Sequence, residues 1–305
     1  MKNKAQFDFN WLFALLAGAA ILVLAIYGVA QLGDSMRFKS DTETATQISI
    51  LTDPLQAGFA EGKFGKIIFR QETRIINDCY SESFGTNEIS VSTHSDVGEE
   101  WLRQGVAAKV PNKYIFSSYE SGKTFYVFSK PFYYPFKVSD LVFVSSKNYC
   151  FVNPSEEIKE DILGLNMENI KLKEEQNCSK DSLFVCFNTN QCDINVYGDS
   201  EQGYVEKGGK TMNYVGNLIY GAIFSEKELY DCNVMRLMYR TSKSASVFSE
   251  KSDLMNGRAC NTNLKSDLLV LSGSTLGATS DNLLSNYKIA QQIELKNNQE
   301  LCGLW

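Results

Sequence analysis

The sequence predicts an α+β protein in which a mixed, largely antiparallel β-rich region lies between an N-terminal transmembrane helix and a C-terminal helical hairpin or bundle. Three observations predict this arrangement. An uncharged apolar run opens the chain, clustered β-forming residues fill its middle, and capped segments with helical periodicity fill its last third. The predicted boundaries are residues 1–33 for the leader and transmembrane helix, 34–64 for a helical connector, 65–215 for a β-rich ectodomain and 216–305 for a helical subdomain packed on the sheet.

The apolar run at residues 11–30 reads WLFALLAGAAILVLAIYGVA and carries no charge. About 20 helical residues cross a hydrocarbon layer roughly 30 Å thick. Trp11 and Tyr27 lie near its ends, where amphipathic rings favour the headgroup region. We therefore predict a retained anchor, with the lipid bilayer as a partner. A buried core helix and a signal peptide cleaved after Ala30 are the alternatives.

Charges on either side of this run set the predicted orientation. Lys2 and Lys4 precede it, whereas the basic residues that follow it are diluted by Asp34, Asp41 and Glu43. This bias predicts a cytoplasmic N-terminus and an extracytoplasmic ectodomain at the cell membrane. The net charge is −6 without a clustered basic segment, so a nucleic-acid partner is not expected.

All eight cysteines lie after the apolar run, which indicates disulfides in an oxidising compartment. Buried free thiols and a zinc site are the alternatives, although the chain has one histidine and lacks a C-x-x-C pair. Cys186 and Cys192 flank a turn between two strand-like segments, so we expect them to pair across a hairpin. Cys260 and Cys302, at the ends of two predicted helices, form a second candidate pair.

The middle of the chain is predicted to contain several strands and hairpins. The segment at residues 112–130 reads as a hairpin around Glu120-Ser121-Gly122-Lys123, and residues 203–216 as another around Gly208-Gly209. A helix is predicted over residues 157–165, after a capping sequence that contains Pro154. Residues 41–55 carry apolar side chains at helical spacing and form the predicted connector.

The last third contains three predicted helices. Ser225-Glu226-Lys227-Glu228 is a capping box that opens a long helix ending near Gly257. Residues 264–273 form the second helix, and Ser280-Asp281 begins the third. Short loops between them predict mutual packing.

Motifs for catalysis or cofactor binding are scarce. His94 lies among Thr93, Ser95 and Asp96, but a catalytic triad depends on spatial geometry and no G-x-S-x-G motif accompanies it. Gly273-Ser274-Thr275-Leu276-Gly277 has the spacing of that motif with threonine at its centre, but it follows a predicted helix and is expected to join two helices. The acidic pairs at residues 99–100, 156–157 and 174–175 could serve glycoside hydrolysis but are more typical of solvated surface. We predict no enzymatic activity, cofactor or metal.

An aromatic run is the candidate binding surface. Its residues are Phe132, Tyr133, Tyr134 and Phe136 around Pro135. Exposed aromatic patches mark contacts with carbohydrate or protein, whereas buried ones belong to the core.

The N-terminal residues KAQFDF, just before the apolar run, resemble those of archaeal type IV pilin-like proteins with a class III signal peptide. The resemblance implies cleavage between Ala5 and Gln6 and packing of the apolar helix against other copies or envelope proteins. Ala5 stands where glycine is usual, and Asn10 stands where pilins carry glutamate. The segments around residues 232–240 and 301–305 resemble uncharacterised archaeal membrane proteins.

The predicted function is therefore that of a non-enzymatic, single-pass surface protein, either a pilin-like subunit or an accessory protein of an envelope assembly. An anchored binding protein for an extracellular ligand and an anchored hydrolase are the alternatives.

Overall fold

The structure is a computed structural model that describes residues 13–28, 39–46, 64–95, 100–117, 119–174, 177–256, 262–300 and 302–305. Its first sheet has the strand order β3-β2-β1-β5-β6-β4. The strands are β1 (Phe64–Tyr80), β2 (Thr86–Thr93), β3 (Ala108–Pro111), β4 (Tyr114–Phe116), β5 (Tyr119–Tyr133) and β6 (Lys137–Ser145). Only β4 pairs in parallel, with β6, so this sheet is largely antiparallel.

The second sheet has the order β12-β11-β10-β9-β7-β8. The strands are β7 (Tyr149–Val152), β8 (Ile170–Leu172), β9 (Leu183–Phe187), β10 (Ile194–Gly198), β11 (Gln202–Lys207) and β12 (Lys210–Val215). Strands β10, β9, β7 and β8 pair in parallel, whereas β10, β11 and β12 pair antiparallel. The predicted α+β class is thus confirmed, but with two mixed sheets instead of one.

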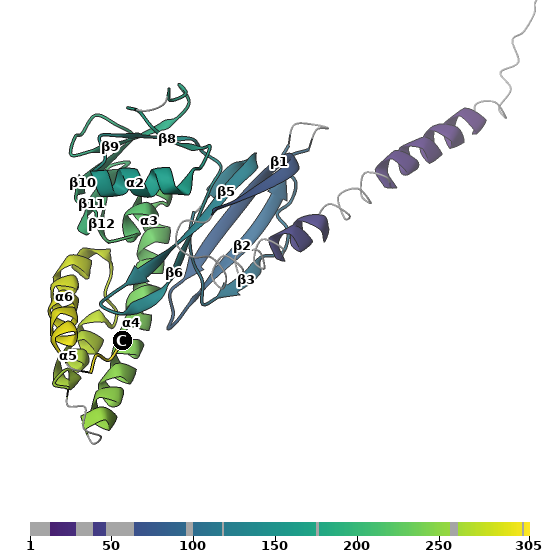
Figure 1. Ribbon diagram of the computed structural model, residues 1–305. Coiled ribbons are helices and arrows are strands. Elements are labelled where there is room, and N and C mark those ends of the chain that lie inside the picture. The colour runs from purple at the N-terminus through teal and green to yellow at the C-terminus, as the bar shows by residue number, and fades with distance from the viewer. Residues whose placement is uncertain are drawn as a thin grey trace, which may run out of the picture.

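Helices connect and cover the two sheets. They are α2 (Glu156–Leu165), α3 (Leu218–Phe224), α4 (Lys227–Asn256), α5 (Lys265–Thr275) and α6 (Leu283–Gln299). Helix α3 contacts β6 of the first sheet and both β11 and β12 of the second, while α4 contacts strands of each. Figure 1 shows α4, α5 and α6 together on one side of the molecule, with the helix over residues 13–28 projecting from the other.

The structure contradicts the predicted transmembrane helix, and with it the single-pass location at a cell membrane. The first helix is described over residues 13–28. Within the described ranges, no helix combines the length and the apolar character that a membrane crossing requires.

The connector is helical over residues 39–46, and residues 47–63 lie outside the described part of the chain.

The hairpin predicted around Glu120-Ser121-Gly122-Lys123 is wrong, because these residues lie inside the single long strand β5. Glu120 is buried and accepts hydrogen bonds from the backbone N–H of Ser146, at 2.9 Å, and from its hydroxyl, at 2.7 Å. Lys147 approaches the same carboxylate at 3.5 Å. These distant partners keep the segment extended, whereas its local composition resembles a turn.

The hairpin predicted around Cys186 and Cys192 is also wrong, since β9 and β10 run parallel. The intervening chain returns to the start of β9 before β10 begins. Asn188 adopts the left-handed conformation with φ of 55°, and Asp193 accepts a hydrogen bond of 2.8 Å from the backbone N–H of Phe184. Asn188-Thr189-Asn190 is therefore part of a loop that reverses the chain twice.

Other predicted elements are confirmed. Strands β11 and β12 form an antiparallel hairpin, and Gly208 and Gly209 have φ of 57° and 73°, as a type I′ turn requires. The three predicted C-terminal helices correspond to α4, α5 and α6, and the helix after Pro154 is α2. Gly257 lies outside the described residues.

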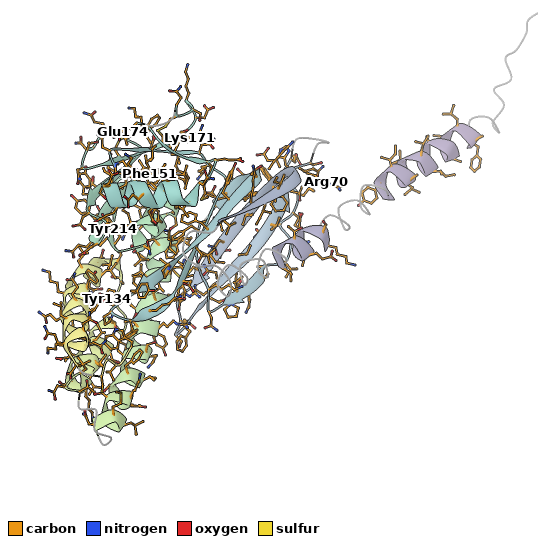
Figure 2. All side chains as sticks on the ribbon, viewed as in Figure 1. Arg70, Tyr134, Phe151, Lys171, Glu174 and Tyr214 are labelled. Atoms are coloured by element: carbon orange, nitrogen blue, oxygen red, sulfur yellow. A yellow bond between two sulfur atoms is a disulfide. The ribbon has the colours of Figure 1, made fainter. Side chains whose placement is uncertain are left out.

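Buried tyrosines distinguish the main hydrophobic core, which joins both sheets to the helices. Tyr134, Tyr214 and Tyr230 donate hydrogen bonds to the backbone carbonyls of Leu283, Asp199 and Asn213, at 2.8, 2.7 and 2.6 Å respectively. Figure 2 shows Tyr134 beside α6 and Tyr214 near the second sheet. Each hydroxyl therefore keeps a partner while its ring fills the core.

We predict that the protein loses stability above about pH 10, where unfolded tyrosine ionises. Burial raises the pKa of Tyr134, Tyr149, Tyr214, Tyr220 and Tyr230, so the folded chain retains protons that the unfolded chain releases. Each tyrosine should lower the free energy of unfolding by up to about 1.4 kcal/mol per pH unit.

Two buried bases oppose this trend. Burial lowers the pKa of Lys207, and it lowers the pKa of Arg236 to about 10. These two groups therefore stabilise the folded state as pH rises. The five tyrosines outnumber them, so the net effect is a loss of stability. Unfolding in guanidinium chloride at several pH values between about 8 and 11 measures how the free energy of unfolding changes with pH. A free energy of unfolding that stays constant over this range would contradict the prediction.

Candidate functional site

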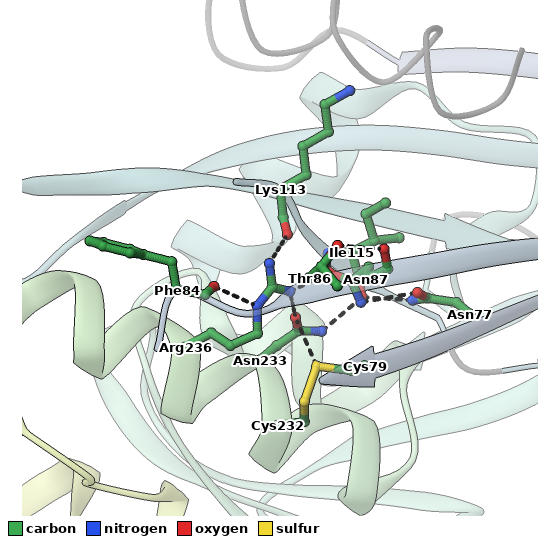
Figure 3. The surroundings of a disulfide bond; sticks show 10 residues. All are labelled: Asn77, Cys79, Phe84, Thr86, Asn87, Lys113, Ile115, Cys232, Asn233 and Arg236. Atoms are coloured by element: carbon green, nitrogen blue, oxygen red, sulfur yellow. Dashed lines mark hydrogen bonds between the residues drawn. A yellow bond between two sulfur atoms is a disulfide. The ribbon is translucent and has the colours of Figure 1, made fainter. Parts of the chain in front are cut away.

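The guanidinium of Arg236 is the largest fully buried polar group, and it ties α4 to the first sheet (Figure 3). It donates to the backbone carbonyls of Phe84, at 3.0 Å, and Lys113, at 2.8 Å. It also donates to the side-chain oxygens of Asn87, at 2.5 Å, and Asn233, at 2.8 Å. The Tyr114 ring lies 4.8 Å from the guanidinium carbon.

Amides and carbonyls compensate this charge, since Arg236 forms no ion pair with a carboxylate among the described residues. Asn77 and Asn233 both donate to the carbonyl of Ile115, at 2.9 and 2.8 Å, and the Cys79–Cys232 disulfide adjoins the cluster. Protein groups occupy four guanidinium donors, so we assign this cluster a structural role.

The structure contains the disulfides Cys79–Cys232, Cys150–Cys178 and Cys186–Cys192. The sequence suggested only the last of these. Of the other candidate pair, Cys302 is not a free thiol, and Cys260 lies outside the described residues. Within the described ranges, no group of three His, Cys, Asp or Glu side chains is placed to hold a metal ion.

The aromatic run does not form an exposed groove. Phe132, Tyr134 and Phe136 are buried in the main core, and Tyr133 alone is exposed, at 53%. Phe136 packs 5.5 Å from the Trp305 ring and 4.7 Å from the Phe248 ring. These aromatics join the end of β5 to the C-terminal helices, so the interpretation as a binding surface is wrong for all but Tyr133.

The remaining catalytic candidates are not brought together. The His94 ring packs edge-on against Trp101 at 5.0 Å. Thr275 ends α5 and donates a 2.7 Å hydrogen bond to the carbonyl of Leu271, which is a structural contact. Glu157 is the one member of an acidic pair that lines a described cavity. Asp96, Glu99 and Glu175 lie outside the described residues.

A polar cavity of about 410 Å³ lies where β5, α2 and α3 meet. Its lining residues come from the end of β5, one side of α2, the turn before β11 and the start of α3. They are Lys130, Pro131, Glu157, Ile158, Glu160, Asp161, Gly164, Ser200, Gly216, Asn217, Ile219 and Tyr220. The volume falls within the range of about 300–1,000 Å³ that is usual for small-molecule sites.

Asp161 is the centre of this cavity's hydrogen-bond network. One carboxylate oxygen accepts from the ammonium of Lys130, and the other accepts from the hydroxyl of Tyr220 at 2.6 Å. The Lys130 side chain is only 7% exposed. Burial, reinforced by the Asp161 charge, raises the pKa of Tyr220 well above its ordinary value. Tyr220 therefore remains a neutral hydrogen-bond donor.

The cavity offers both hydrogen-bond donors and acceptors. Asn217 donates to the carbonyl of Pro131 at 2.8 Å, and Ser200 donates to Glu157. Glu160 is exposed and forms no hydrogen bond or ion pair in the described structure. Sequence reasoning missed this site because its members come from distant segments, and only Glu157 had been noted, as part of an acidic pair.

A scan against protein-family models, a search of curated proteins and a search of solved structures each returned no match to this chain. Ala5 and Gln6, the predicted leader-peptidase site, lie outside the described residues. The cavity and the exposed apolar helix over residues 13–28 are thus the two features that bear on function.

We predict that Arg236→Met lowers the free energy of unfolding by about 3–5 kcal/mol, because it leaves several buried oxygens without a donor. Urea unfolding of the oxidised protein measures the loss. Arg70→Met is the control: Arg70 is exposed on β1, and its substitution should change stability by less than about 0.5 kcal/mol. Equal stability of the two variants would refute the role assigned to Arg236.

Proposed function

We propose that this protein is a non-enzymatic subunit or accessory protein of an extracytoplasmic assembly, in which the helix over residues 13–28 packs against the same helix of other copies. One observation carries the proposal. The large apolar side chains of this helix are between 56% and 70% exposed.

The exposed surface of this helix is apolar on every side. Ile21, Leu22, Val23 and Leu24 follow one another, and successive helical residues point about 100° apart. A helix that is hydrophobic all round is normally buried. Residues 17–20 read AGAA, and such small side chains allow neighbouring helices to approach closely. Packing among copies would remove this surface from water, which favours association.

The disulfides support an oxidising compartment. Cys79–Cys232 links residues 153 positions apart and joins β1 to α4. Such bonds persist in secreted and surface proteins and are rare in the cytosol. They also make the body a rigid unit that an assembly could display.

The resemblance of the N-terminus to pilin-like proteins adds one test. If the chain is processed as such a subunit, the mature protein lacks residues 1–5 and begins at Gln6. Intact mass spectrometry of protein purified from its native host should show this loss, and Ala5→Leu should prevent it. A native chain that retains residues 1–5 would contradict the pilin-like part of the proposal.

We predict that Val23→Glu weakens self-association, because each copy would bury a carboxylate among apolar helices. Val247→Glu is the matched control, since Val247 lies on α4 and is 64% exposed, compared with 66% for Val23. Sedimentation velocity over a range of concentrations should show oligomers for the native chain and the control, and smaller species for Val23→Glu. A monomeric native chain, or equal effects of both substitutions, would refute the proposal.

A further inference from the structure

We propose that the cavity between β5, α2 and α3 is a binding site for a neutral polyhydroxylated ligand the size of a monosaccharide. This inference is independent of the assembly proposed above. It begins from Lys130, whose buried ammonium carries three N–H donors but makes a single described hydrogen bond, to Asp161. A nearly buried ammonium that borders a cavity requires further oxygen acceptors within that cavity.

The opposite requirement comes from the carboxylates of α2. Glu157 accepts from Ser200 alone, and Glu160 accepts from no described group. A carboxylate can accept about four hydrogen bonds. A ligand that replaces solvent in the cavity can therefore accept hydrogen bonds from Lys130 and donate them to the two exposed glutamates. A hydroxyl group does both, and a ring bearing several hydroxyls can do so on several sides.

Charge selects among ligands of this size. The lining holds one lysine and three carboxylates, Glu157, Glu160 and Asp161, so its formal charge is −2. Asp161 already pairs with the lysine. An anionic ligand would face uncompensated repulsion, which disfavours phosphates and free acids. A small cation would be attracted by the carboxylates but cannot accept hydrogen bonds from the Lys130 ammonium. A neutral polyol therefore fits the cavity best.

The walls also suit a sugar ring. Pro131, Ile158 and Ile219 supply apolar surface beside the polar groups. Small-molecule sites usually combine apolar walls with a few convergent polar groups.

Gly164 provides a steric test. It lines the cavity from α2, and a Cβ built on it would meet no atom within 4 Å. Gly164→Phe therefore places a bulky side chain at the cavity wall without a clash at its Cβ. Loss of a helical glycine also favours the helix. Gly273→Phe is the matched control, because Gly273 lies in α5, has equally open surroundings and does not line the cavity.

The experiment is saturation-transfer NMR on the full, oxidised chain with a panel of neutral hexoses, pentoses and N-acetylhexosamines. L-alanine and putrescine serve as zwitterionic and cationic probes. We expect transfer to at least one neutral sugar, retained in Gly273→Phe and lost in Gly164→Phe. Transfer to none of the sugars, transfer only to alanine or putrescine, or transfer that survives in Gly164→Phe would overturn the proposal.

A second variant covers the case in which Gly164→Phe does not fold. Glu160→Ala removes an exposed carboxylate of the cavity and should weaken sugar binding about tenfold. Glu156→Ala, on the same helix but outside the cavity, should leave the affinity unchanged. Equal affinities in these two variants would likewise refute the proposal.

Discussion

The buried guanidinium of Arg236 is the constraint on which the rest of the structure depends. It receives no described carboxylate partner, so the positions of four oxygens from Phe84, Asn87, Lys113 and Asn233 must compensate its charge. These oxygens belong to the loops and strands at one end of the first sheet and to α4 itself. The register of α4 on the sheet is therefore specific, since a shift by one residue would leave a buried charge and several buried acceptors unpaired.

The second sheet and the cavity follow from the position of the helices on the first sheet. Gly221 of α3 lies against the Phe116 ring, where an added Cβ would come within 2.8 Å. This close approach seats α3 between the sheets and brings Tyr220 to Asp161 of α2. Glu157 and Glu160, the acidic side chains with few hydrogen-bond partners, lie on α2 together with Asp161. Helix α3 thus carries both the Gly221–Phe116 packing contact and Tyr220 of the proposed ligand site, whose acidic side chains come from α2.

Sequence patterns predicted the elements whose signals are local. The Gly208-Gly209 turn and the α+β class depend on neighbouring residues, and the structure confirms them. A long helix does begin at Lys227, but the predicted capping box is not formed, because the Ser225 hydroxyl donates to the carbonyl of Gly221. Glu120 shows the limit, because its turn-like surroundings are overridden by Ser146 and Lys147, which approach from another strand. From the sequence, Phe132 and Phe136 resemble an exposed patch, but both are buried, and Phe136 packs against Phe248 of α4 and against Trp305. The Lys130–Asp161–Tyr220 network and the Cys79–Cys232 bond join distant positions and leave no local signal.

The Cys79–Cys232 bond adjoins the Arg236 cluster, so either could hold α4 in place. Hydrogen–deuterium exchange on the double variant Cys79→Ser, Cys232→Ser, compared with the native oxidised chain, separates the two most directly. If the guanidinium positions the helix, the amides of α4 around Arg236 keep their protection in the double variant, since its four hydrogen bonds remain. Loss of protection along α4 would show that the covalent bond holds the helix and would contradict the central role of Arg236.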